Sequence, residues 1–315
     1  MKGYLEEIRN TEATGPAAVF LFLLLADVVL KGGRYTEFDA ETLAANALPL
    51  VLVALGQYFV ILVRGIDLSL GPVMSVSSTL AAVLFPLGTV PALLVAIGSG
   101  ALAGTVNGLL VTRLTLSPII VTLATMSIWD GVSLVVLPTP GGVIPPALQA
   151  ALTSSSVVLP VPILLLIATT GVGAWIMSTR FGLHLRAFGG DDAAAKASGV
   201  AVRRIQFTAY VIAGLFAALG GIYSAVATSA GSPIIGDGYI LSSIAAVVVG
   251  GVPLIGGRGS PIGVTMGALT LSIIGSLLYF ANLSDFYQSL INGVILVVVV
   301  GAVAARDMIW KAVAG

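Results

Sequence analysis

A short charged motif lies between two long apolar stretches near residue 65. It reads Arg64-Gly65-Ile66-Asp67-Leu68-Ser69-Leu70-Gly71, with glycine on both sides of the acid. Glycines around a charge predict a break in a membrane helix, and such a break offers backbone groups and a carboxylate to a polar solute. The same residues also fit a tight turn in which Asp67 caps the next helix. Both interpretations stay open, and one side chain can serve both.

Uncharged polar residues within the apolar stretches are the second candidates for solute contact. Hydroxyl and amide groups suit a pathway for a polyol or sugar, although Ser and Thr in membrane helices more often bond their own backbone or a neighbouring helix. Asn107 is the most informative, because lipid offers its amide no partner. The pathway candidates are Asp67, Ser69, Asn107, Thr122 and Thr125, within a wider polar set of Gln57, Ser127, Tyr223, Ser242 and Ser243.

Two other acids have simpler explanations. Asp130 lies beside Trp129 near the expected outer end of its membrane helix, where its carboxylate can reach the membrane interface. Asp237 lies in a glycine-rich outer loop and is expected to be solvated.

The longest polar stretch of the chain is residues 179–206. Gly190 ends one segment, and Asp191 and Asp192 then stand where an N-cap and an acidic first turn favour a new helix. The alanine-rich run that follows is strongly helix-forming, and Gly199 closes it. Such a short helix across the membrane face has the shape of a docking element, although the composition also fits a solvated loop.

These polar residues are set in a very apolar chain. Of its 315 residues 57% are hydrophobic and only 9% are charged, with a mean hydropathy of +1.08, whereas soluble domains carry about 25% charged residues. A soluble fold of this composition would expose a large apolar surface, so soluble enzymes are excluded. The balance of 14 basic and 14 acidic residues leaves no basic surface for nucleic acid. The sequence predicts an all-α polytopic membrane protein, with residues 1–315 as one transmembrane domain.

Charge-free stretches long enough to cross the hydrocarbon core predict about ten membrane helices. The proline-rich segment 138–162 is interpreted as a loop, and the charged N-terminus as a short cytoplasmic helix rather than a cleavable signal. The predicted helices are 16–30, 42–63, two within 68–112, 114–137, 161–178, 207–229, 239–256, 261–280 and 287–304. With both termini cytoplasmic, every Lys and Arg except Lys31 and Arg34 falls on the inner side, as the positive-inside rule requires.

Glycines recur every four residues in both halves of the chain. Such spacing places them along one helix face, where two backbones can approach closely. Two such stripes suggest a duplicated unit, although simple helix packing explains them as well. The packing candidates are Gly100, Gly104, Gly108, Gly259, Gly263 and Gly267.

The sequence contains no apparatus for catalysis or energy coupling. No Gly-Lys dipeptide is present, so a nucleotide-binding loop of the Walker type is absent. With one histidine, His184, no cysteine and no pair of acids buried at helical spacing, we expect no metal site and no cofactor in this chain. If ATP drives transport, another subunit binds it.

Four segments in order are similar to one family. Gly65–Gly71 matches a Gly-Ile-Asp-Leu-Ser-x-Gly signature, and Asn107–Met126, Phe181–Val200 and Gly256–Ser260 match three further blocks. Together they resemble the permease subunits of bacterial ABC importers for ribose, xylose, arabinose and galactose-type sugars. The resemblance implies a multi-pass inner-membrane permease, paired with a second copy or a homologue. It also implies two cytoplasmic ATPase subunits that hold ATP and Mg²⁺, a periplasmic sugar-binding protein, and alternating access without chemistry in the permease.

The resemblance further implies that the 179–206 segment carries the cytoplasmic coupling helix. The coupling candidates are Arg186, Asp191, Asp192, Lys196, Ser198 and Gly199. The chain departs from the family pattern at four positions. Arg64 and Pro72 stand where Gly and Ser are usual, Ala193 replaces an acid, and Asp130 stands where a basic residue is frequent.

A monosaccharide importer is therefore the leading interpretation, in which the chain is a transport subunit and not an enzyme. Nucleoside and branched-chain amino-acid ABC permeases are the nearest alternatives. A secondary transporter fits less well, because it needs titratable relays within the membrane. The candidates for such a relay, Asp27, Asp67 and Asp130, are scattered along the chain.

Overall fold

The computed structural model describes residues 2–154 and 159–280, together with a few single residues between 287 and 297. The named elements in this part of the chain are all helical. They are α1 (Lys2–Leu30), α2 (Glu37–Leu62), α3 (Leu70–Leu84) continued by the 3₁₀ turn η1 (Phe85–Leu87), α4 (Thr89–Arg113), α5 (Pro118–Val136), α6 (Pro146–Thr153), α7 (Val161–Ser178), α8 (Arg180–Gly190), α9 (Asp192–Ala197), α10 (Val202–Thr228), α11 (Tyr239–Val249) and α12 (Pro261–Phe280).

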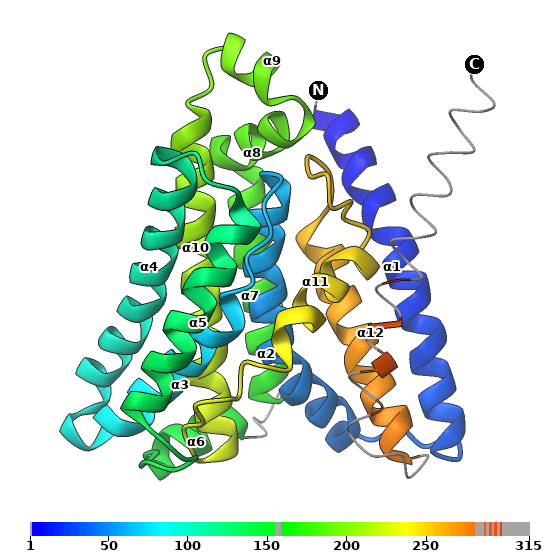
Figure 1. The fold of residues 1–315 in the computed structure, drawn as a ribbon. Coiled ribbons are helices and arrows are strands. Elements are labelled where there is room, and N and C mark those ends of the chain that lie inside the picture. The colour runs from blue at the N-terminus through cyan, green and yellow to red at the C-terminus, as the bar shows by residue number, and fades with distance from the viewer. Residues whose placement is uncertain are drawn as a thin grey trace.

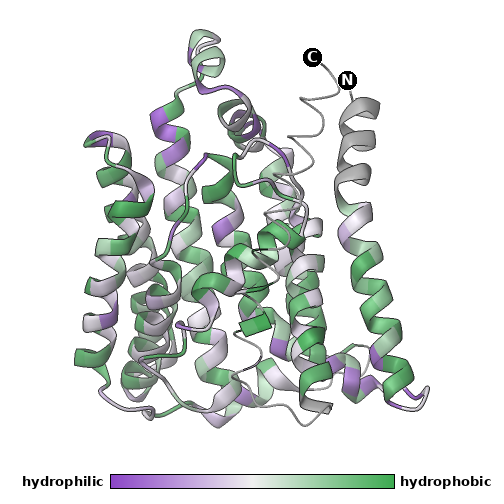
Figure 2. Cartoon of the chain, turned by 45° about the vertical axis from the view of Figure 1, so that its right-hand side comes forward, coloured by the Kyte–Doolittle hydropathy of each residue, from purple (hydrophilic) through white to green (hydrophobic). Residues whose placement is uncertain are grey.

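Eight of the described helices are long and apolar enough to cross a membrane: α1, α2, α3 with η1, α4, α5, α7, α10 and α12. They form a bundle with α2 at its centre, where it contacts α10, α11, α12 and α7 (Figure 1). The peripheral helices turn large apolar side chains outward, among them Phe22, Val135 and Trp175. Hydrophilic residues gather at the two ends of the bundle (Figure 2). The fold is that of a polytopic helical membrane protein.

The distribution of basic residues in the structure matches the predicted sidedness. The helices α8 and α9 lie at one end of the bundle together with the last turns of α2 and α4, whereas the α1–α2 turn lies at the opposite end (Figure 1). Arg64 and Arg113 therefore share an end with the basic residues of 180–204, and Lys31 and Arg34 lie at the other.

Helix starts follow local rules that the sequence makes visible. Thr36 and Asp39 form a capping box at the start of α2, in which each side chain accepts from the other residue's backbone N–H. Proline stands at the first position of α5 and α12 and at the second of α7, where its missing N–H costs no helical hydrogen bond.

Glycines bring α4 and α10 into backbone contact. A Cβ atom on Gly100 would overlap the carbonyl of Gly214, and one on Gly104 would overlap the backbone of Tyr210. Gly108 packs against Phe207, and a Cβ there would lie 2.9 Å from the Phe207 ring and 3.1 Å from its carbonyl oxygen. This face of α4 leaves room only for hydrogen atoms, which is the reason for glycine at each position.

The second glycine stripe is only partly helical. Gly263 and Gly267 lie in α12 and contact the α11 end around Gly250. Gly259, however, precedes α12 and has a φ of 128°, a backbone conformation that favours glycine. The expectation of one stripe that includes Gly259 is therefore wrong, because the chain has not yet entered the helix.

Four sequence-based expectations about the elements need correction or lie outside the described residues. The N-terminus is not a separate short helix, because α1 runs unbroken from Lys2 to Leu30. The 138–162 segment contains the short helix α6, which begins with a proline at its first position. The 239–256 span is wrong, since α11 has 11 residues and ends at Val249, a length of about 16 Å at 1.5 Å per residue. The 287–304 span lies largely outside the described residues.

Two membrane helices are interrupted in related ways. Residues 63–69 separate α2 from α3, and residues 229–238 separate α10 from α11. In both cases the chain turns back into the bundle before the next helix begins at about half its depth, and α3 and α11 then run toward opposite ends (Figure 1). Residues 37–84 and 202–249 are therefore arranged in opposite directions, as in the inverted repeats of transporters. The glycine-bearing helices α4 and α12 follow these two segments in corresponding places.

Candidate functional site

The first break is organised by Asp67, which lies in its middle and is 2% exposed. The carboxylate oxygen Oδ1 accepts from the backbone N–H of Ser69 at 2.9 Å and from the Ser69 hydroxyl at 2.6 Å. Asn107 on α4 donates its Nδ2 to Asp67 Oδ2 at 3.2 Å. Ser69, not Asp67, occupies the N-cap position of α3. Asp67 thus binds the backbone one residue before the helix and reaches sideways to α4.

Helix α5 completes this network. Thr125 donates its hydroxyl to Asn107 Oδ1 at 2.7 Å, and Thr122 donates to the Ile66 carbonyl at 3.2 Å. Asn107 also donates to the Ser69 hydroxyl at 2.8 Å. The structure therefore brings all five predicted pathway residues together in one hydrogen-bonded group, and each of them is at most 4% exposed. Buried polar groups joined in this way fix a single local geometry.

Two further side chains reach the same break. In the amide orientation that satisfies both partners, Gln57 of α2 donates to the Asp67 carbonyl at 2.9 Å and accepts from the Asp67 N–H at 3.2 Å. Among the described residues the buried hydroxyl of Tyr210 has no hydrogen-bond partner, and a Cβ on Gly65 would lie 2.6 Å from it. Sequence reasoning included Gln57 in the wider polar set and missed Tyr210, whose spacing on α10 resembles that of any core aromatic residue.

Serines satisfy the backbone of the second break. Ser75 Oγ accepts from the Gly236 N–H at 2.9 Å, Ser78 Oγ accepts from the Ser232 N–H at 3.2 Å, and Ser133 Oγ donates to the Pro233 carbonyl at 2.9 Å. Non-helical backbone at membrane depth requires such partners, since lipid supplies none. The serines of α3 and α5 thus hold the 229–238 segment inside the bundle, which sequence reasoning did not foresee.

The two breaks meet at a pair of glycines. A Cβ on Gly71 would lie 2.5 Å from the Gly236 carbonyl, and a Cβ on Gly236 would overlap the Gly71 backbone. The first turn of α3 therefore touches the segment before α11 with no side chain between them. Asp237, the next residue, is exposed, as expected, and Asp130 on α5 is partly exposed.

The predicted coupling residues lie on or next to α8 and α9. These two helices lie at one end of the bundle, and α9 projects beyond the other helices (Figure 1). Asp191 N-caps α9 and accepts from the Ala194 N–H at 3.0 Å, which confirms the predicted helix start. Asp192 and Lys196 belong to α9, and Ser198 is its C-cap. Gly199 has a φ of 82°, which suits glycine after a helix end.

The long polar segment is therefore mostly helical and its two ends differ in exposure. Asp191, Asp192, Lys196, Ser198 and Gly199 are exposed. Arg186 on α8 instead points toward the bundle, where it donates to the Gly259 carbonyl at 3.2 Å. Arg186 holds α8 in place, and α9 presents the free surface.

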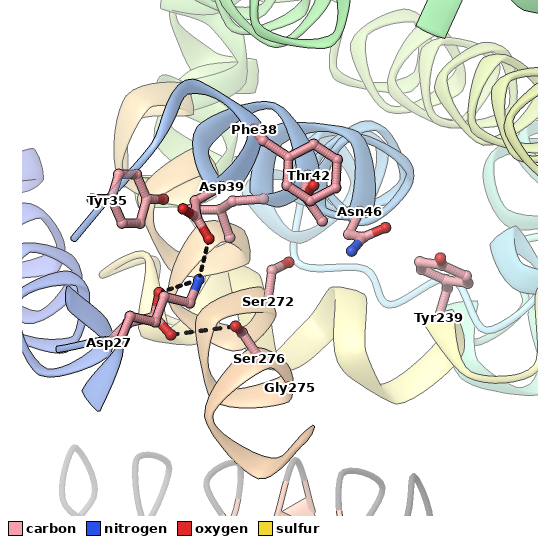
Figure 3. A pocket seen from close by; sticks show the side chains of 12 residues that line it. Asp27, Tyr35, Phe38, Asp39, Thr42, Asn46, Tyr239, Ser272, Gly275 and Ser276 are labelled. Atoms are coloured by element: carbon pink, nitrogen blue, oxygen red, sulfur yellow. Dashed lines mark hydrogen bonds and ion pairs between the residues drawn. The ribbon is translucent and has the colours of Figure 1, made fainter. Parts of the chain in front are cut away.

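An ion triad at the opposite end was not predicted. Lys31 lies 3.0 Å from Asp27 Oδ2 and 2.9 Å from Asp39 Oδ1, and Ser276 donates to Asp27 at 3.3 Å. The triad forms one side of a cavity of about 520 Å³ between α1, α2, α11 and α12, which Asn46 and Tyr239 also line (Figure 3). Burial lowers the pKa of Lys31, but its hydrogen bonds to Asp39 and Asp27 outweigh this effect and raise the pKa. Lys31 is therefore charged at neutral pH.

Replacement of Lys31 by methionine is expected to destabilise the protein by about 3 kcal/mol, because it leaves the buried Asp27 carboxylate without its cation. The thermal unfolding midpoint in detergent measures this effect. The matched control is Arg34→Met, which removes an exposed charge from the same turn. Equal midpoints for the two variants would show that the triad contributes nothing to stability.

Comparisons with known proteins place this architecture in a family. Residues 40–300 match the model described as the branched-chain amino acid transport system permease component. The chain belongs to this permease family. The matched range includes both helix breaks, their polar network, and α8 and α9.

Individual relatives of this permease are named for several solutes. This chain is 36% identical to the ribose import permease of Bacillus subtilis over an alignment of 256 residues, and the alignment covers 79% of each chain. The D-allose transport system permease of Escherichia coli is 31% identical, over 92% of this chain and 91% of its own. The autoinducer 2 import system permease of an Enterobacter species is 34% identical, over 92% and 85%. No solved structure matches the chain.

Family membership and the apolar helices together make this permease a multi-pass protein of the inner membrane. It is a transport subunit rather than an enzyme, because its relatives are import permeases.

Proposed function

We propose that this permease carries a monosaccharide, a pentose or a hexose, through the inner membrane as part of an ATP-driven importer. Relatives named for ribose and D-allose import support the sugar class over nucleosides and branched-chain amino acids. In this proposal a periplasmic binding protein delivers the sugar and selects it. Separate ATPase subunits hold ATP and Mg²⁺, and a second permease, identical or homologous, completes the membrane core.

The observation that carries the proposal is the meeting of two interrupted helices beside a buried polar network. Half-length helices that begin inside the membrane can move as units and open the centre of the bundle to one side at a time. Asp67, Ser69, Asn107, Thr122 and Thr125 adjoin this meeting point, and in the present conformation they bind one another. In the proposed cycle, movement of α3 exposes these acceptors and donors to the hydroxyl groups of a passing sugar.

The other half of the proposal assigns α9 to the ATPase. This helix is short, protrudes from the end of the bundle and carries exposed charges of both signs, in Asp191, Asp192 and Lys196 (Figure 1). Surface charges of this kind suit a polar contact with a cytoplasmic subunit. Closure of the ATPase pair on ATP would then displace α9, and α8 would pass the displacement into the bundle.

Uptake by the reconstituted transporter tests the function. The permease is purified with its ATPase and incorporated into liposomes with ATP inside, and the binding protein and radiolabelled solute are added outside. We expect accumulation of ribose or of a hexose such as D-allose that requires ATP, with no uptake of leucine or adenosine. Accumulation of leucine or adenosine instead, or sugar uptake without ATP, would contradict the proposal. Uptake of autoinducer 2 but of no simple sugar would contradict the assignment of a monosaccharide as the substrate.

A further inference from the structure

Arg64 lies two residues after the end of α2 and has an unusual backbone conformation. Its φ is 58°, in the left-handed region that favours glycine, and its N–H donates to the Ile61 carbonyl at 2.9 Å. A helix frequently ends with glycine in this conformation, because any Cβ is disfavoured there. Contacts of the arginine side chain must therefore compensate for this unfavourable backbone conformation.

The guanidinium of Arg64 joins three groups at the junction of α8 and α9. Its Nε donates to the Gly189 carbonyl at 3.0 Å and its NH2 to the Gly190 carbonyl at 2.9 Å. Its NH1 lies 3.1 Å from Asp192 Oδ1. The last carbonyls of a helix lack helical partners and carry partial negative charge, so a cation at the end of α8 is favourable. One side chain thus binds the end of α8 and the first turn of α9.

The backbone beneath this contact is tightly packed. A Cβ on Gly189 would overlap both the Leu62 carbonyl and the Gly257 nitrogen, and the Gly257 N–H donates to Leu62 at 3.3 Å. The ends of α2 and α8 therefore touch through main chain, and the 254–258 loop packs against both of them. A displacement of α8 has no side chains to deform at this point, so it moves the end of α2.

Only two residues separate Arg64 from Asp67, the centre of the first break. The ion pair with Asp192 is exposed, with side-chain exposures of 42% for Arg64 and 59% for Asp192, so by itself it adds little stability. The contact instead fixes the relative positions of its three partners, because the planar guanidinium donates in fixed directions.

We propose that Arg64 is a positioning residue that transmits the displacement of α9 to the α2–α3 break. This inference rests on the proposed function of α9 as the ATPase contact. Arg64 touches neither nucleotide nor sugar in this scheme. It ties the moving helices to the segment that holds Asp67.

The test replaces Arg64 by glycine, which suits the left-handed backbone and removes only the side chain. ATP hydrolysis and sugar uptake are measured in the same liposomes, with the purified complex of permease, ATPase and binding protein. We expect uptake to fall at least fivefold while hydrolysis stays within twofold of the wild type, so the ATP consumed per sugar rises by a factor of about 2.5 or more. The Arg64→Lys variant keeps the charge without the planar fork and should rescue only part of the ratio.

The matched control is Arg113→Ala, at the end of α4 on the same face of the bundle. Arg113 is exposed, and its removal should leave the ratio of ATP to sugar unchanged. A wild-type ratio in Arg64→Gly would overturn the proposal and leave Arg64 as an ordinary turn residue. An equal change in Arg113→Ala would overturn it as well, since the effect would then reflect surface charge alone.

A second measurement separates this inference from the proposed function. The chain contains no cysteine, so spin labels can be placed on Ala193→Cys in α9 and Leu114→Cys beside α4 in the permease alone. We expect one narrow distance distribution in the otherwise native chain and a broad one after Arg64→Gly. Identical distributions would show that Arg64 does not hold α9 in place, which would overturn the inference. If the native complex imports no sugar, the proposed function fails while this result stands by itself.

Discussion

Replacement of Asp67 by asparagine is expected to lower sugar uptake about fivefold or more, whereas Asp237→Asn should change it less than twofold. The Asp67 carboxylate accepts hydrogen bonds from Ser69 and Asn107 inside the bundle. An amide nitrogen at that position would face the Asn107 amide nitrogen, donor against donor. Such a mismatch in a buried network costs about 1–3 kcal/mol, which changes an equilibrium constant by about fivefold to 150-fold. Asp237 is exposed, and its carboxylate has no such partner in the part of the chain that the structure describes.

The measurement is the initial rate of uptake by the reconstituted complex, normalised to the amount of permease in the membrane. The informative control is the exchanged pair Asp67→Asn with Asn107→Asp, which restores one acid and one amide. We expect the exchanged pair to recover uptake relative to either single variant. Equal and mild losses in Asp67→Asn and Asp237→Asn would mean that Asp67 serves only the turn before α3.

Replacement of both Asp191 and Asp192 by lysine is expected to detach the ATPase or to uncouple it. Both acids are exposed at the start of α9. Lysine at these positions reverses the charge offered to a partner and opposes the positive end of the helix dipole. Co-purification of the ATPase with the tagged permease measures detachment, and uptake in liposomes measures uncoupling. We expect both to fall at least fivefold, a loss of about 1 kcal/mol or more of binding free energy.

The double variant Asp191→Asn with Asp192→Asn is the matched control for folding of α9. Asparagine caps a helix nearly as well as aspartate, so this variant keeps the Ala194 hydrogen bond while it removes the charge. It should retain α9 and lose only part of the ATPase binding. Full co-purification and full uptake in the lysine variant would show that α9 does not dock the ATPase.

The sequence predicts the chemistry of the first break better than its geometry. Glycines on both sides of Asp67 are visible in the chain, and Asn107 stands out because membrane lipid has no partner for an amide. That these residues bind one another depends on α4 and α5 lying beside the break, which their spacing in sequence does not contain. In this conformation the network is buried and its members bind one another.

The second break is invisible in the sequence for a physical reason. Its stretch from 229 to 256 is rich in apolar residues and glycine, and hydropathy alone predicts a full membrane helix after residue 239. The serines that hold the non-helical backbone, Ser75, Ser78 and Ser133, sit on other helices, where a hydroxyl is common. The short α11 therefore follows from tertiary hydrogen bonds and not from local preference.

The role of Arg64, a departure from the family pattern, can be inferred only from the structure. In the sequence it is an arginine at a glycine position. In the structure its partners come from residues more than a hundred positions away, at Gly189, Gly190 and Asp192. Helix periodicity predicts the elements on which such residues lie, but the approach of α8 to α2 depends on the glycines between them.

The contact between Gly71 and Gly236 has a consequence for electrical insulation. Under the proposed function, the place where α3 and α11 begin would separate the two aqueous compartments with two stretches of main chain pressed together. Main chain cannot swing aside as a rotamer can, so this seal opens only when one whole segment shifts against the other. Ion leakage through the resting permease should thus be the most sensitive indicator of damage there, ahead of any change in the rate of solute import.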